Sequence, residues 1–262
     1  MSTRQLSTTT RFVDYRDRYP SIRMERTDGI LLLTFHTDSG PLQWTLAAHN
    51  EFADAFGDIA RDQDNEVVIM TGTGHSFSGP HASKNPNHWS DIREWDHVMR
   101  IGLRMMSNLL DVEALTISCI NGPALRHAEI PLLADIVLAS EDAAFQDTAH
   151  LANQRTPGDG VNLVMPLLMG FNRARYFLLT GQVISAQEAL TMGLVNEVVP
   201  KASLVPRAFE LGRELRKQNL YARRYTKWLM MEPLKDLFRR SLGHGLALEG
   251  LAALDLAREP ER

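Results

Sequence analysis

"LTGQVISAQEALTMGLVNEVVP", residues 179–200, is the stretch that says most about the fold. Residues 185–192 have the spacing of a short helix, Gly193 can end that helix in a turn, and the residues near 194–198 form a short strand. The order of helix, glycine turn and strand favours an α/β fold, in which helices pack on sheets.

The segments before this stretch alternate between strand-like and helix-like patterns. Thr27-Asp28-Gly29 predicts the turn of a hairpin, and Thr45 can cap the helix that comes next. Strands that alternate with helices support the α/β class. We expect the hairpin at residues 21–25 and 30–37, buried strands at about 66–71, 115–120 and 135–139, and helices at about 46–61 and 91–110.

From Val161 onward the pattern is almost wholly helical, apart from the strand near residues 194–198. Neither linker composition nor internal repeats divide the chain. Residues 1–20, which include a polar tract at 7–10, are expected to form a loose N-terminal arm. Helices are expected at about 161–169, 172–179, 185–192, 202–217, 221–231 and 234–256.

Composition narrows the class of protein. The chain has 262 residues, of which 44% are hydrophobic, and its formal net charge is −4, which argues against a nucleic-acid partner. Its single cysteine, Cys119, excludes an internal disulfide and a thiolate metal site. No apolar stretch approaches the roughly 20 residues of a membrane span, and the first residues are not signal-like. We therefore expect a cytoplasmic protein without a membrane partner.

"NGPALRHAEIP", residues 121–131, is unusual because it places three ionisable side chains between two buried segments. They are Arg126, His127 and Glu129. Farther along, His150 ends "FQDTAH" and Asp159 lies in "PGDG", and an imidazole near a carboxylate is a common acid–base arrangement. Each side chain also has a structural explanation when taken alone, such as a satisfied core histidine or a turn aspartate. The full set of polar residues in unexpected places is Trp44, His49, His81, His127, Glu129, His150, Asp159 and Glu249.

The sequence lacks the motifs of several classes of enzyme. The chain has no GxSxG nucleophile elbow, and Gly72-Thr73-Gly74 is too short for a dinucleotide fingerprint. His127 and His150 alone would leave a metal shell incomplete. We therefore expect neither a metal nor a cofactor.

Five segments, taken together, resemble the crotonase (enoyl-CoA hydratase/isomerase) superfamily. They are "EVVIMTGTGHSFSG", "ISCINGPAL", "ADIVLASEDAAFQD", "PGDG" and "LLTGQVISAQEALTMGLVNEVVP". The resemblance runs from about residue 21 to 258 and implies a ββα superhelix, built of stacked β-β-α turns. It also implies a core at 21–200 and a helical C-terminal region at 201–262 that forms a homotrimer, often paired into a hexamer.

Two segments depart from the superfamily pattern at the oxyanion hole. Ordinary members hold a thioester enolate between two backbone N–H groups, one in an Ala-Gly pair after phenylalanine and one in a triple glycine. The first segment here is Phe77-Ser78-Gly79-Pro80, and the triple glycine is replaced by Arg126-His127-Ala128. Bulky side chains block close approach of the backbone, so an acyl-CoA substrate is not expected.

The residues that remain resemble those of 6-oxocamphor hydrolase and related β-diketone hydrolases. That branch cleaves carbon–carbon bonds without CoA, and all six of its matching positions are present. The resemblance implies a retro-Claisen hydrolysis of a cyclic or bicyclic β-diketone to a keto acid. The six positions are Trp44, His49, His127, His150, Asp159 and Glu249.

The expected roles follow from the needs of this reaction. His150 is the expected base, oriented by Asp159 or Glu249. His127 and the Trp44 indole stabilise the enolate, and His127 or Asp159 donates the final proton. The expected substrate-binding residues are Trp44, His49, His127, Gly79 and His81.

Two alternatives remain at this stage. One is a CoA-dependent hydratase, isomerase or acyl-CoA hydrolase that uses Glu129, and the other is a catalytically silent oligomer. The sequence leaves open which diketone is cleaved, whether trimers form hexamers, and which acid is the partner of His150.

Overall fold

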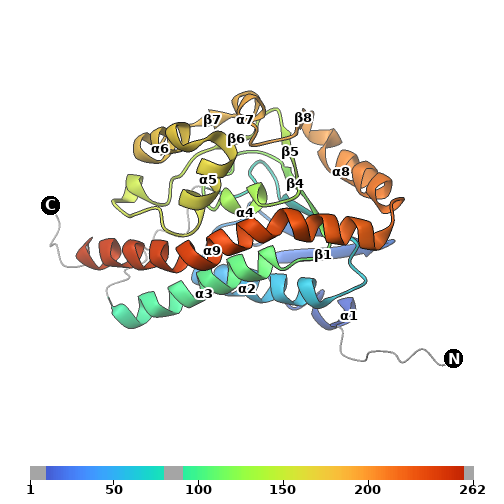
Figure 1. Cartoon of the computed structure of the whole chain (residues 1–262), viewed down its shortest axis with the longest axis horizontal. Coiled ribbons are helices and arrows are strands. Elements are labelled where there is room, and N and C mark those ends of the chain that lie inside the picture. The colour runs from blue at the N-terminus through green and yellow to red at the C-terminus, as the bar shows by residue number, and fades with distance from the viewer. Residues whose placement is uncertain (1–9, 80–90, 257–262) are drawn as a thin grey trace.

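The computed structural model describes residues 10–79 and 91–256, and Figure 1 shows their arrangement. Within these residues, six strands form the main sheet in the order β1-β2-β3-β4-β5-β8. The first two strands are antiparallel and the remaining pairs are parallel, which confirms the expected α/β class. The strands are β1 (Ile22–Thr27), β2 (Ile30–Phe35), β3 (Val67–Gly72), β4 (Leu115–Ile120), β5 (Ile136–Ser140) and β8 (Glu197–Val199).

The hairpin between β1 and β2 turns at Asp28 and Gly29. Both residues have positive φ angles, 49° and 72°, which is the geometry that two-residue hairpin turns favour. The Asp-Gly pair was therefore a correct signal for this turn.

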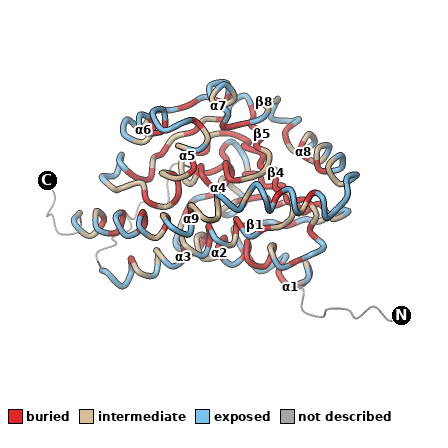
Figure 2. Tube along the Cα trace, viewed as in Figure 1, coloured by how far each residue is buried: buried red, intermediate tan, exposed pale blue. Residues whose placement is uncertain are grey.

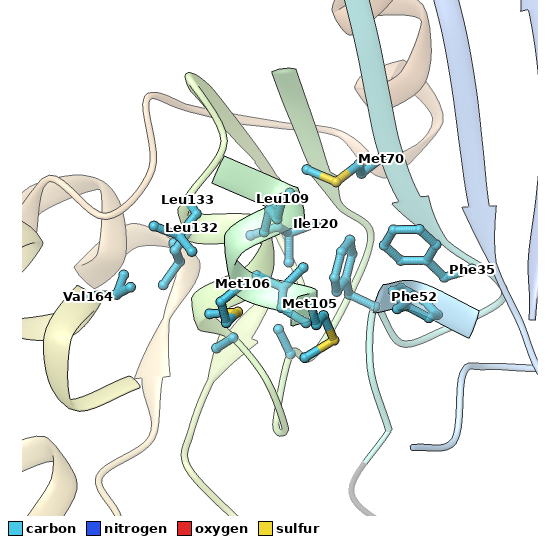
Figure 3. Close-up of a cluster of buried hydrophobic side chains, with 14 of the residues drawn as sticks. Phe35, Phe52, Met70, Met105, Met106, Leu109, Ile120, Leu132, Leu133 and Val164 are labelled. Carbon is cyan, nitrogen blue, oxygen red and sulfur yellow. The ribbon is translucent and has the colours of Figure 1, made fainter. Parts of the chain in front are cut away.

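The central strands are buried because helices cover both faces of the sheet (Figure 2). Alternate residues of β3 point to opposite faces. Val68 and Met70 join the core on the side of α2 (Leu46–Arg61) and α3 (Ile92–Leu110), which Figure 3 shows in close-up. Val67 and Ile69 pack on the other side, with α8 (Lys201–Arg216). Continuous burial explains why β3 has no polar alternation in its sequence.

The stretch at residues 179–200 folds as its pattern predicts. Ser185 and Glu188 form a capping box at the start of α7 (Ala186–Met192), and Gly193 ends the helix with a φ of 85°. The chain then enters β8, slightly later than expected. Within the described residues, a second sheet pairs β6 (Ala144–Phe145) with β7 (Ile184–Ser185).

The C-terminal helices differ from the prediction in one respect. The expected helices at 221–231 and 234–256 are one helix, α9 (Leu220–Leu256), with Pro233 inside it. Helix α9 packs on α3 beyond Pro233 (Figure 1), and before it the Lys227 ammonium donates to the carbonyl of Ala114 (2.7 Å). These contacts on both sides override the local break that proline favours. The other elements of this half are α4 (Glu129–Leu132), the 3₁₀ helix η1 (Leu151–Asn153), α5 (Val161–Met169) and α6 (Phe171–Thr180).

The N-terminal arm expected at residues 1–20 needs correction in its second part. Helix α1 (Phe12–Tyr15) is present, and Tyr15 and Tyr19 are buried. The Tyr15 hydroxyl donates a hydrogen bond to Asp62 (2.8 Å), which ties this segment to the end of α2. Residues 1–9 lie outside the described part of the chain. Among the described helices, none is both long and apolar enough to cross a bilayer.

Candidate active site

A cavity between α2, α3 and α9 collects most of the predicted site residues. The empty space inside it, including the part open to solvent, is about 700 Å³. His49, His127, His150, Asp159 and Glu249 line it, together with Arg126 and Arg155. The remaining wall is largely apolar and includes Leu46, Val98, Ile101, Met105 and Leu246.

The loop between β4 and α4 carries His127 in an unusual backbone conformation. The φ of His127 is 52°, a left-handed value that few residues other than glycine adopt. Hydrogen bonds hold the loop around it: the Ser78 hydroxyl donates to the Arg126 carbonyl, and the Thr148 hydroxyl donates to the Leu125 carbonyl (2.7 Å). Strain of this kind is typical of functional sites, where the surroundings impose the conformation.

Two histidines from different elements form a pair at one end of the cavity. The Nδ1 atom of His49 lies 2.6 Å from the carbonyl oxygen of Thr45, so this nitrogen carries a proton and donates a hydrogen bond to that oxygen. The other nitrogen, Nε2, lies 3.0 Å from Nε2 of His127. Burial and the neighbouring charge of His127 lower the pKa of His49 to about 3, so His49 is neutral. Its Nε2 atom therefore accepts a hydrogen bond from the Nε2–H group of His127.

The opposite nitrogen of His127 faces two carboxylates. Its Nδ1 atom lies 2.8 Å from Oε1 of Glu129 and 3.1 Å from Oδ2 of Asp159. Burial lowers the pKa of His127, but these two carboxylates more than offset it and raise that pKa to about 9. Both ring nitrogens therefore hold a proton and both already have protein partners. Burial and the charge of Asp159 raise the pKa of Glu129 to about 7.

His150 is held in a similar way by a residue that sequence reasoning missed. Its Nδ1 atom lies 2.8 Å from Oδ1 of Asp147, whereas Nε2 faces Asp159 at 3.5 Å and Glu249 at 3.6 Å. The partner that orients His150 through Nδ1 is therefore Asp147. Burial opposes the charged ring, but Asp159 and Asp147 raise the pKa of His150 well above its usual value. The three-residue spacing within "FQDTAH" was the available signal.

Asp159 lies between the two rings and connects them. Burial raises the pKa of its carboxyl, but His150 and His127 outweigh it, and the pKa is lowered overall. The glycines around Asp159 permit close packing of α9 against this loop. A Cβ atom on Gly158 would come within 2.2 Å of the carbonyl oxygen of Gly245, so this contact requires glycine, and it brings Glu249 to the cavity.

Two other predicted residues, Trp44 and Gly79, are not among the described residues that line the cavity. Trp44 is buried behind His127, with 4.5 Å between ring centroids, and its indole nitrogen has no hydrogen-bond partner among the described residues. The prediction for Gly79 needs correction, because its amide donates to the carbonyl of Leu42 (3.1 Å) and points its N–H into the protein. His81 belongs to residues 80–90, outside the described part of the chain.

The backbone amides of the expected first oxyanion segment are therefore in use. Besides Gly79, the amide of Ser78 donates to the carbonyl of Pro123 (3.3 Å). These amides donate to carbonyls of other segments of the chain instead of presenting free N–H groups.

Three ligand atoms, from His127, Glu129 and Asp159, lie within 4.8 Å of one another and could surround a cation. The proton on Nδ1 of His127 occupies the same position. A metal would have to displace a proton from a group whose pKa is about 9, which weakens metal binding at neutral pH.

Residues 25–244 match the family model described as enoyl-CoA hydratase/isomerase. Among curated proteins, the chain is 28% identical to the probable peroxisomal enoyl-CoA hydratase 1 of Arabidopsis thaliana, across 86% of this chain and 82% of that protein. It is 24% identical to the hydroxycinnamoyl-CoA hydratase-lyase of Pseudomonas fluorescens, across 81% of this chain and 79% of that protein.

Solved structures agree with this fold. A β-diketone hydrolase from the cyanobacterium Anabaena sp., bound to (S)-3-oxocyclohexyl acetic acid, superposes with a TM-score of 0.90 and is 41% identical, across 96% of this chain and 99% of that one. An enoyl-CoA hydratase/isomerase from Mycobacterium paratuberculosis superposes with a TM-score of 0.82 at 22% identity, across 91% and 95% of the two chains, and this likeness concerns the fold alone.

Proposed function

The chain belongs to the enoyl-CoA hydratase/isomerase family, and we propose that it hydrolyses a carbon–carbon bond of a cyclic or bicyclic β-diketone without coenzyme A. One observation carries the proposal: His127 and His150 face one cavity, each has a buried carboxylate behind its Nδ1 atom, and Asp159 lies between them. The 41% identity to the cyanobacterial β-diketone hydrolase supports it.

The reaction sets three chemical tasks. Water loses a proton to a base as its oxygen adds to one carbonyl carbon. The carbon–carbon bond then breaks, and its electron pair forms the enolate of the second carbonyl. Finally the enolate carbon takes up a proton, which leaves a keto acid. The site must therefore supply a base, a group that stabilises the enolate oxygen, and a proton donor.

His127 stabilises the enolate through its positive charge. Because Glu129, Asp159 and His49 occupy both of its N–H groups, it has no proton to spare for a direct hydrogen bond in the ligand-free protein. A buried imidazolium still lowers the energy of a nearby oxyanion, because the low-dielectric surroundings strengthen their attraction. The indole N–H of Trp44 also has no partner among the described residues, but Trp44 is buried behind His127 and does not line the cavity.

His150 serves as the base after it loses a proton. With its pKa raised well above the usual value, the ring is charged in the ligand-free protein. Glu249 can take the Nε2 proton because the two groups lie 3.6 Å apart and burial raises the pKa of that carboxyl. An apolar diketone that displaces water favours this uncharged pair over the ion pair. Neutral His150 then accepts the proton of the attacking water.

The final proton comes from an imidazolium. Asp159 was one expected donor, but the two rings lower the pKa of its carboxyl, so it carries no proton at neutral pH. The proton that His150 takes from water can return to the enolate carbon, which closes the cycle without an external acid.

The second candidate is a CoA-dependent reaction, which the family match favours. A panel of cyclic β-diketones, including the bicyclic one whose opening gives 3-oxocyclohexyl acetic acid, separates the two. We expect at least one diketone to be consumed with release of its keto acid, and no turnover of crotonyl-CoA. His150→Ala should lower diketone turnover by roughly 10² to 10⁴. Turnover of crotonyl-CoA without any diketone turnover would reject the proposal.

A further inference from the structure

Two guanidinium groups lie in the wall of the same cavity, and the reaction steps above do not use them. Arg126 precedes His127 in the β4–α4 loop, and Arg155 follows η1. The backbone N–H of Arg155 donates to the carbonyl of His150 (3.0 Å), which fixes this arginine to the turn that carries the base. Both arginines therefore line the cavity that His150 faces.

Arg126 has an unused hydrogen-bond donor. Its Nε atom is buried and has no partner among the described residues, and none of their carboxylates forms an ion pair with this side chain. The nearby acids are already engaged: Asp147 by His150, and Asp159 by both rings. A buried donor without a partner destabilises the folded protein, so its presence in a cavity wall needs an explanation.

The shape of the guanidinium indicates the chemistry of a ligand that it would bind. In arginine, Nε–H and one terminal N–H lie side by side on one edge of the guanidinium, and this edge matches the two oxygens of a carboxylate. We propose that Arg126 binds the carboxylate that diketone cleavage creates, with Arg155 as a second positive charge beside it. This inference rests on the proposed function, because the neutral diketone has no such group and the keto acid does.

Electrostatics supports a ligand with one negative charge. Burial lowers the pKa of Arg126 and the charge of Arg155 lowers it further, and together they outweigh Asp159, Asp147 and Glu249, which raise it. The two cations therefore repel each other inside the cavity. Both remain protonated at neutral pH, because arginine does not lose its proton in proteins. A carboxylate between them relieves this repulsion, whereas an uncharged ligand of the same shape does not.

The test is a calorimetric titration with 3-oxocyclohexyl acetic acid and with its uncharged carboxamide, in the absence of turnover. The intact protein should bind the acid at least about 10-fold more tightly than the amide, and Arg126→Gln should weaken acid binding by about 10-fold to 100-fold with little change for the amide. Arg126→Lys, which keeps the charge but loses the planar edge, should give an intermediate result. Arg100→Gln, on the exposed face of α3, is the matched control and should bind like the intact protein.

Equal affinity of the intact protein for acid and amide, or failure to bind the acid, would overturn the carboxylate site, and this comparison needs no variant to fold. The same conclusion follows if Arg126→Gln and Arg100→Gln bind the acid equally well. Acid preference without diketone turnover would leave the site standing and reject the proposed function. Diketone turnover without acid preference would do the reverse.

Discussion

The charge on His127 predicts how the stability of the protein depends on pH. Its pKa is about 9 in the folded protein and 6.5 in an unfolded chain, a difference that corresponds to about 3 kcal/mol. Because the folded pKa is the higher one, the folded state binds the extra proton. This stabilisation is complete below pH 6.5 and is lost as the pH rises through 9. The free energy of unfolding should therefore fall over this interval.

Neighbouring groups titrate in the same direction, so the measurement needs a reference protein. The pKa of Glu129 rises from 4.5 to about 7 on folding, which lowers stability as the pH increases between these values. His150 also gains a proton on folding. His127→Asn removes the central titrating ring and keeps the others. The stability difference between the two proteins above pH 7 reports the contribution of His127 together with the change that its loss makes in the pKa values of Glu129 and Asp159.

Urea unfolding at pH 7, 8, 9 and 10, at one protein concentration, provides the measurement. The free energy by which the intact protein exceeds His127→Asn should shrink by about 3 kcal/mol between pH 7 and 10. A difference that stays constant across this range would mean that His127 is neutral in the folded protein. The assignment of an imidazolium between Glu129 and Asp159 would then be wrong.

Three further predictions concern the charges around the rings. Asp147→Asn removes the carboxylate beside Nδ1 of His150, so the pKa of His150 should fall. The rising limb of kcat/KM against pH should then move to lower pH by about 1 to 3 units. A limb that does not move would show that Asp147 does not influence the base. Glu249→Gln removes the proton acceptor for Nε2 and should lower kcat by roughly 10² or more at neutral pH, whereas unchanged kcat would exclude the proton transfer. Asp159→Asn should lower the pKa values of both His127 and His150 in an NMR titration, and a shift confined to one ring would show that Asp159 does not connect them.

Much of the fold could be predicted from local patterns because those patterns have local causes. Helix α2 begins and ends at the predicted residues, since Thr45 caps it through the amide of Ala48 (3.1 Å) and its apolar spacing is regular. The failures involve contacts between distant segments. The break at Pro233 and the loose segment around Tyr15 were predicted from neighbouring residues, whereas packing on α3 and a hydrogen bond to Asp62 decide both.

Most residues of the candidate site could be predicted from the sequence, but their charge states could not. The resemblance to a known family predicted that His127, His150, Asp159 and Glu249 belong to one site, because these residues lie in recognisable sequence motifs. The structure has all four in the lining of one cavity. Charge states could not be predicted, since they depend on which atom faces which. The sequence does not reveal that His49 accepts a hydrogen bond from His127. This bond occupies the N–H group of His127 that was expected to reach the substrate. For Asp147 as the partner of His150, the signal in the sequence is their three-residue spacing, which does not show which atoms meet.

The charge balance of the cavity assigns separate cations to two different negative charges. Before a ligand enters, the charged rings of His127 and His150 are paired with Glu129, Asp147 and Asp159, and a diketone brings no charge of its own into the cavity. Cleavage first creates a transient enolate, which only has to be stabilised until its carbon is protonated. It then leaves a permanent carboxylate, which would compete with the carboxylates of the site for His150 if no other cation were available. Arg126, with a buried N–H that no described group accepts, keeps that product away from the base and leaves His150 ready for the next proton transfer.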